Sequence, residues 1–330
     1  MKLKFLYIAV FLFAMTACSQ SELPAVSLLE NNFYDQTHLY RLNLRGTVKE
    51  VREYLMDTSA DSESVLSATY KFDSEGNIIT YDPTGEGDKV QPYWLPVNAE
   101  VYQYEYDAHS RLSEVHIFSN GQATRVYKLQ YGNHSNYMPL PFEFKPFEDW
   151  LIKGITTITC EESKFYYEFD GEKLVLEKDN NGWTEYDTVY FKHNYPVLRT
   201  SVIRDGDYEI QRTETQWLFQ LPNGVPVRKT VTVSEDGHKY SFQTIYAING
   251  LPLEKIVQDN SISQKNYTYN TMGWLWKMTV LSDNSETGSM DCIYDMDQNN
   301  NWIWCQQKVE GFIGWEYSEG TLIKTRTITY

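Results

Sequence analysis

The chain is short of positive charge. Its 330 residues include 29 lysines and arginines against 45 aspartates and glutamates, so the formal net charge at pH 7 is −16. A chain with this balance repels phosphate backbones, and we therefore expect no nucleic acid among its partners. Hydrophobic residues still make up 42% of the sequence, which is enough for a folded core and argues against wholesale disorder.

The sequence also lacks the usual local signatures of a catalytic or metal centre. It has no H-E-x-x-H motif, no cysteine pair at zinc-binding spacing and no G-x-S-x-G nucleophile elbow. Its six histidines, His116 among them, are scattered at no ligand spacing, and Cys160 precedes an acidic stretch that would not activate a thiol. We therefore expect no enzyme activity. A hydrolase whose site residues meet only in the fold stays an alternative.

The apolar run at the N-terminus is too short to span a membrane and remain there. Lys2 and Lys4 precede "FLYIAVFLFAM", and "TACSQ" follows, which predicts a secretory signal peptide in residues 1–17. "MTAC" resembles the lipobox of bacterial lipoproteins, with an ordinary signal peptide as the alternative. The resemblance implies that Cys18 becomes the acylated first residue and anchors the chain in the bacterial envelope. Ser19 favours the outer membrane, with the protein facing the periplasm or the surface.

A short phrase recurs along the chain. In "YEYDAHSRL" at 104–112, tyrosines alternate with a glutamate as in a half-buried strand, and Asp107 can cap a turn in which Ser110 takes a left-handed conformation. "YKFDSEGNI" at 70–78 and "YTYNTMGWL" at 267–275 have glycine at that position. Each copy predicts two strands and a turn, so the fold class is all-β, with tandem antiparallel hairpins forming an extended, twisted or curled sheet. Looser copies stand at 166–174, 219–229, 246–255 and 293–304.

These phrases resemble the YD repeat of RHS proteins, whose core is Tyr-x-Tyr-Asp-x-x-Gly-Arg-Leu. "NLRGTVKEVREY" at 43–54 and the closing "NNWIW…TRTITY" resemble a broad group of uncharacterised Gram-negative lipoproteins. The resemblance implies a YD-like β-repeat domain at 43–330, after the signal peptide and a tether at 18–42. The proline-rich stretch at 137–150 is the candidate break within that domain. Relatives with many repeats form hollow shells around a toxin, a function not carried over to a chain with so few copies.

One candidate ligand site lies in the copy at 267–275. If the strands keep one offset beyond the turn, Asn270 pairs with Trp274 and Thr268 opposes Trp276. Both indoles would then lie on the solvated face, as a stacking platform for a sugar or an apolar side chain. The alternative is that a neighbouring segment covers them, as is usual for tryptophan.

A second candidate site imitates a calcium loop. Asp295, Asp297, Asn299 and Asn301 stand at alternate positions and offer the oxygen ligands that Ca²⁺ prefers. The match to an EF-hand loop is incomplete, because Asn300 replaces the glycine of the sharp turn and the bidentate glutamate is missing. A polar hairpin tip is the alternative that we favour, so we expect no cofactor other than this calcium ion.

The same tip determines how Cys292 and Cys305 lie. A loop of four residues would set the two cysteines directly opposite each other and permit a disulfide. A loop of three residues with a bulge sets Met296 opposite Trp302 and, if that offset continues, turns the cysteines to opposite faces. We favour the second arrangement, which predicts that no disulfide forms.

Three functions are compatible with these features. The first is a non-enzymatic, envelope-anchored interaction or structural module, whose partners are the membrane, through the lipid anchor, and an unidentified protein or glycan. The second is a carbohydrate-binding module that uses exposed aromatic rings. The third is an unrecognised hydrolase, which ranks last because repeats made mostly of turn and core positions leave little sequence for a catalytic set.

Overall fold

The computed structural model shows an all-β protein, as the repeats predicted. It describes residues 38–42, 44–58, 64–83, 100–141, 144–145, 151–161, 165–180, 183–192, 194–205, 208–220, 226–234, 239–246, 252–258, 262–271, 273–283, 285–311 and 320–330. The predicted signal peptide, Cys18 and most of the tether lie outside the described residues. Within the described part, one short helix, α3 (His38–Arg41), accompanies the strands. No described helix has the length and apolar character needed to cross a membrane.

The described strands follow one another in chain order with short connections. They are β1 (Glu50–Asp57), β2 (Val65–Phe72), β3 (Ile78–Asp82), β4 (Val101–Tyr106), β5 (Leu112–Ser119), β6 (Gln122–Tyr131), β7 (Tyr137–Pro139), β8 (Leu151–Lys153), β9 (Ile155–Cys160), β10 (Phe165–Phe169), β11 (Lys173–Asn180), β12 (Trp183–Lys192), β13 (Tyr195–Asp205), β14 (Tyr208–Gln220), β15 (Pro226–Ser234), β16 (Lys239–Tyr246), β17 (Pro252–Gln258), β18 (Ile262–Tyr269), β19 (Leu275–Ser282), β20 (Ser285–Met296), β21 (Trp302–Gly311) and β22 (Gly320–Thr329).

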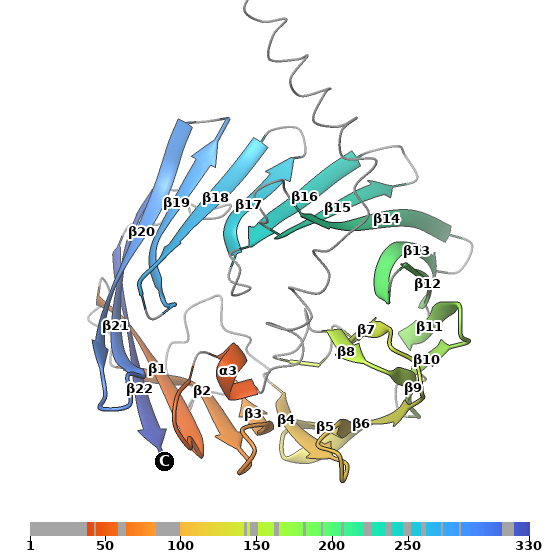
Figure 1. Ribbon diagram of the computed structural model, residues 1–330, viewed down its shortest axis with the longest axis horizontal. Coiled ribbons are helices and arrows are strands. Elements are labelled where there is room, and N and C mark those ends of the chain that lie inside the picture. The colour runs from red at the N-terminus through yellow and green to blue at the C-terminus, as the bar shows by residue number, and fades with distance from the viewer. Residues whose placement is uncertain are drawn as a thin grey trace, which may run out of the picture.

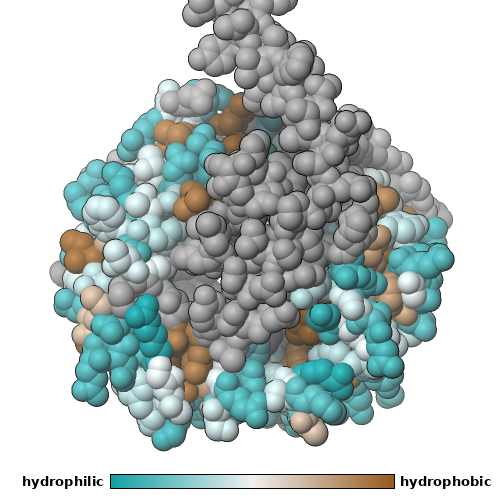
Figure 2. All heavy atoms as spheres, in the orientation of Figure 1, coloured by the Kyte–Doolittle hydropathy of each residue, from teal (hydrophilic) through white to brown (hydrophobic). Residues whose placement is uncertain are grey.

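The main sheet contains 20 of these strands. Consecutive strands pair antiparallel, β6 pairs with β9, and β22 pairs with β1 over the register Glu50↔Thr329 to Asp57↔Leu322. The order of pairing therefore returns to its start, and the strands lie around a ring (Figure 1). On the side shown in Figure 2, the described surface is mainly hydrophilic, and its apolar residues form small separate groups.

The proline-rich stretch leaves the main sheet. β7 pairs with β8 in a small sheet of its own, while β6 and β9 continue the main sheet on either side of this excursion. β7 and β8 lie on the inner side of the ring (Figure 1). The excursion is held there by buried side chains, including Tyr137, Met138 and Phe144, none more than about 1% exposed.

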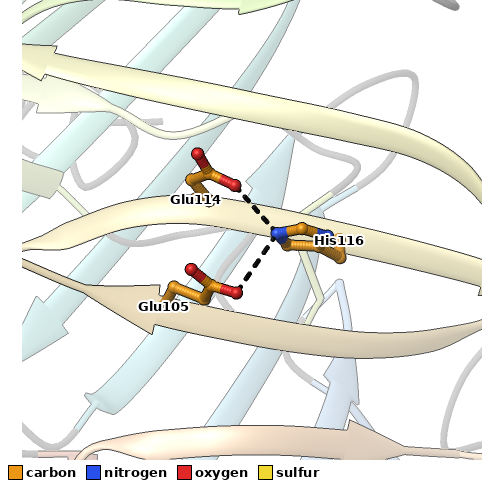
Figure 3. Close-up of side chains that lie close together, drawn as sticks. All are labelled: Glu105, Glu114 and His116. Carbon is orange, nitrogen blue, oxygen red and sulfur yellow. Dashed lines mark hydrogen bonds and ion pairs between the residues drawn. The ribbon is translucent and has the colours of Figure 1, made fainter.

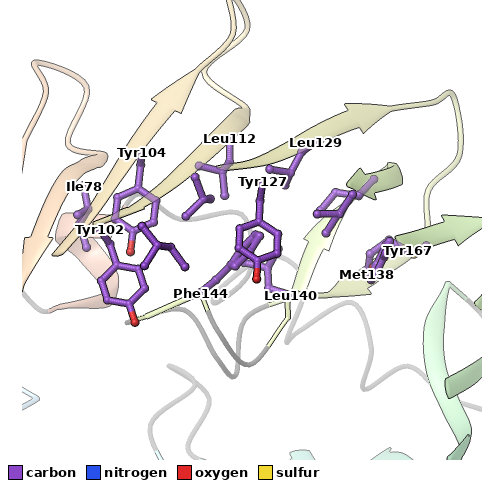
Figure 4. Close-up of a cluster of buried hydrophobic side chains, with 14 of the residues drawn as sticks. Ile78, Tyr102, Tyr104, Leu112, Tyr127, Leu129, Met138, Leu140, Phe144 and Tyr167 are labelled. Carbon is purple, nitrogen blue, oxygen red and sulfur yellow. The ribbon is translucent and has the colours of Figure 1, made fainter. Parts of the chain in front are cut away.

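The core lies between this excursion and the inner face of β2 to β11. Tyr127 packs edge-on against Phe144 and Phe165, with ring centroids 4.9 and 5.5 Å apart. Figure 4 shows Tyr102, Tyr104 and Tyr127 on the sheet side of this cluster. Aromatic side chains each bury a large area, so a core built largely of tyrosine still supplies strong hydrophobic stabilisation.

The recurring phrase folds into the predicted turn. Asp107 Oδ1 accepts the backbone N–H groups of His109 at 2.8 Å and Arg111 at 3.0 Å, and Ser110 has a φ of 58°. The cap and the left-handed position are therefore both confirmed. Equivalent left-handed positions occur at Gly76, Gly273 and Asn300.

The register beyond the turn differs from the prediction. Tyr106 pairs with Leu112 as expected, but the next pair is Glu105 with Glu114, because the return strand holds one extra residue, Ser113. A β-bulge of this kind shifts all later pairs by one residue. The same two-step register follows the pairs Phe72↔Ile78, Tyr246↔Pro252, Tyr269↔Leu275 and Met296↔Trp302.

Tyrosine hydroxyls tie neighbouring hairpins together at these bulges. Each donates to the carbonyl of the first residue in the return strand of the preceding hairpin, where the bulge interrupts the ladder. Burial raises the pKa of Tyr106 far above its ordinary value, so the hydroxyl stays a donor. The bonds are Tyr106 Oη to Ile78 O at 2.7 Å, Tyr131 Oη to Leu112 O at 2.8 Å and Tyr294 Oη to Leu275 O at 2.7 Å.

Candidate functional site

The turn that was predicted to bind calcium joins the two ends of the described chain. Asn301 is completely buried, and its Oδ1 accepts the N–H of Arg45 at 2.7 Å. Its Nδ2 donates to the Arg45 carbonyl and to the Tyr330 hydroxyl, both at 2.8 Å. The Tyr330 hydroxyl in turn donates to Asp297 Oδ2. We call Arg45, Asp297, Asn301 and Tyr330 the seam clasp, because they lie where β22 meets β1.

The oxygen atoms expected to hold calcium therefore already have protein partners. Asp297 Oδ1 accepts the N–H groups of Asn299 and Asn301, both at 2.8 Å. Partial burial raises the pKa of Asp297, but the hydrogen bonds from Tyr330 and from these N–H groups outweigh it, so the net shift is downward. Asp295 is exposed and pairs across the ladder with Trp304. The geometry favours a turn cap and a clasp, and calcium binding stays a prediction.

The two-indole platform is not present. Trp274 is 5% exposed, whereas Trp276 is 58% exposed. Trp274 packs against Tyr294 of the next hairpin, with ring centroids 5.4 Å apart. The prediction that both rings share the solvated face was wrong because it placed no bulge after the turn.

The residues predicted to accompany the indoles have other roles. Thr268 pairs with Lys277 rather than Trp276, since Trp276 is the extra residue of the bulge. Asn270 caps its own turn, where its Oδ1 accepts the N–H of Trp274 at 3.0 Å. One exposed indole remains at this position, without the second ring that would make a stacking surface.

A cluster that the sequence did not reveal lies on the hairpin of β4 and β5. Glu105 and Glu114 face each other across the strands, and His116 follows on the same face (Figure 3). His116 Nε2 lies 2.9 Å from Glu114 Oε2 and 3.6 Å from Glu105 Oε1. All three ligand atoms lie within 4.8 Å of one another. The signal was the hairpin register, which opposes the two glutamates only once the bulge is counted.

This cluster brings two carboxylates together with one imidazole. Like charges directly opposite each other on a sheet repel, so a cation between them is stabilising. His116 supplies that cation when it is protonated, and the same three atoms could instead ligate a divalent metal ion. The cluster lies on the face opposite to the buried Tyr102 and Tyr104, and Glu105 is exposed to solvent. It is therefore a surface set and not an enclosed catalytic centre.

Comparison with known proteins finds no matching family model and no matching curated protein. The chain is similar to a porin-like protein from Bacteroides uniformis, with 10% identity and a TM-score of 0.37 over 86% of this chain and 99% of that one. A porin-like protein from Bacteroides vulgatus gives 10% identity and a TM-score of 0.29 over 66% and 98%. The Photorhabdus luminescens Tc holotoxin pore gives 9% and 0.22 over 74% and 15%. TM-scores this low carry no argument about function or location.

Proposed function

We propose that this chain is an envelope-anchored YD-like β-repeat lipoprotein that acts as a non-enzymatic interaction or structural module. The observation that carries the proposal is the use made of the recurring residues. The Asp107 carboxylate caps its turn, the Tyr106 hydroxyl ties two hairpins, and Asn301 joins the ends of the sheet. Residues that might have served chemistry are occupied in holding the sheet.

The anchor is proposed from the sequence. Acylated Cys18 attaches the chain to the membrane, and Ser19 favours the outer membrane. The remaining partner is an unidentified protein or glycan. The carbohydrate-binding alternative has lost its best site, because Trp274 is buried, and the cluster at His116 gives the hydrolase alternative only an exposed surface set.

The anchor is tested by metabolic labelling with an alkyne fatty acid, followed by separation of the inner and outer membranes. The wild-type chain should carry the label and sediment with the outer membrane, while Cys18→Ala should be unlabelled and unprocessed or soluble. Ser19→Asp should keep the label and move toward the inner membrane. Cys160→Ala is the matched control and should label like the wild type. Equal labelling of wild type and Cys18→Ala would refute the anchor.

A further inference from the structure

The bulge after Asn300 changes the relation between two buried cysteines. Cys292 lies opposite Gln307, and Cys305 lies opposite Tyr294. Because side chains alternate along a strand, residues 292, 294, 305 and 307 all point to one face of the sheet. The two cysteines are therefore diagonal neighbours on the same face, each about 1% exposed. The prediction that they lie on opposite faces was wrong, and so was its argument against a disulfide.

The two thiols also interact. A hydrogen bond with Cys305 is the main cause that lowers the pKa of Cys292, and burial opposes it. Lys324 of β22 pairs across the ladder with Cys305, and its positive charge lowers the pKa of Cys292 further. Both cysteines are free thiols in the structure. Cys292 is thus the better nucleophile of a pair whose sulfur atoms already face each other.

We propose that Cys292 and Cys305 form a cross-strand disulfide when a small-molecule disulfide is available as oxidant. The Cys292 thiolate attacks one sulfur of the small disulfide, forming a mixed disulfide and releasing one small thiolate. The Cys305 thiolate then attacks the Cys292 sulfur, which forms the Cys292–Cys305 bond and releases the second small thiolate. The two protein thiols are oxidised, the small disulfide is reduced to two thiols, and their protons pass to these products or to solvent.

This pairing also accounts for the odd cysteine. Cys160 lies in β9, which pairs with β6 and β10 but not with β20 or β21. It is 2% exposed in the core cluster and is the cysteine left without a disulfide partner. The disulfide does not depend on the lipid anchor, because it needs only an oxidising compartment or buffer.

The test is refolding of the full-length chain from denaturant in a buffer of oxidised and reduced glutathione. Refolding gives the oxidant access before the thiols are buried. Free thiols are then alkylated, and the non-reduced digest is mapped by mass spectrometry. The expected product joins the peptides of Cys292 and Cys305 at a mass two hydrogens lower than their sum, with Cys160 alkylated. Cys160→Ser should give the same linkage.

The oxidised wild-type chain should also unfold at a higher temperature than the same preparation in reductant, because the cross-link restricts the unfolded chain. Cys305→Ser should abolish both the linkage and the difference. Recovery of Cys292 and Cys305 alkylated or carrying glutathione would overturn the proposal. So would a major linkage from either of them to Cys18 or Cys160. The wild-type map decides the question even if Cys305→Ser fails to fold.

Discussion

Replacement of Asn301 by alanine is the sharpest test of the seam clasp. The substitution removes three hydrogen bonds: two with the backbone of Arg45, at 2.7 and 2.8 Å, and one with the Tyr330 hydroxyl. A buried polar group that loses its partner costs about 1–3 kcal/mol. The Arg45 backbone is only partly buried, so two losses near the lower limit and one ordinary hydrogen bond give about 3 kcal/mol.

Urea unfolding followed by tryptophan fluorescence measures this loss, with Gln298→Ala as the control. Gln298 is exposed on the same turn, and its truncation should change the free energy of unfolding by no more than about 0.5 kcal/mol. Hydrogen exchange adds a local readout, because Asn301→Ala should speed exchange in β1 and β22 before other strands. A loss below about 1 kcal/mol for Asn301→Ala, with exchange at these strands unchanged, would refute the reasoning.

Further substitutions test the repeated turn and its register. Ser110→Gly should raise the thermal midpoint, by about 0.5–1 kcal/mol of stability, because glycine adopts the left-handed conformation without strain; a lower midpoint would contradict the turn assignment. Tyr106→Phe should lose about 1–2 kcal/mol in urea unfolding, because it leaves the carbonyl that its hydroxyl ties unpaired. Trp274→Ala should cost about 3–5 kcal/mol, and Trp276→Ala at most about 0.5 kcal/mol; similar losses would contradict the bulge. Although desolvation raises the pKa of Asp107, its hydrogen bonds lower it from 3.8 to about 2, so its stabilising contribution is present above pH 3.8 and lost as the pH falls toward 2. Asp107→Asn should flatten the urea midpoint across that range, and an unchanged acid profile would refute the assignment.

The turn could be predicted from sequence because its chemistry is local. An Asp or Asn cap and a left-handed residue three positions later lie within one short phrase, and each has its own conformational signature. Ser110 and Asn300 were identified in this way although neither is glycine. Alternation of apolar and polar residues then gave the strands on either side, and with them the all-β fold.

The second bulge could not be predicted because no residue type marks it. Ser113 and Trp276 occupy the extra position in two hairpins, and they share neither size nor polarity. The position is set by the twist of the paired strands and by which side chains pack on the inner face. This single missed residue misplaced Trp274 and the cysteine pair together.

The clasp and the surface cluster failed for different reasons. Asn301 contacts Arg45 across 256 positions of sequence, a proximity that only the return of β22 to β1 creates. Glu105, Glu114 and His116 lie close in sequence, but their meeting depends on the corrected register. Both sets consist of common polar residues, which carry no local motif.

The pairing of β22 with β1 also limits how this protein can vary in size. Every strand of the main sheet runs antiparallel to its two neighbours, and strand direction can alternate consistently around a ring only when the number of strands is even. Loss of one strand would force β22 and β1 to run parallel or leave both edges unpaired, where another chain could add. Relatives should therefore differ by whole hairpins, so the repeat unit visible in the sequence is also the smallest step by which the ring can grow or shrink.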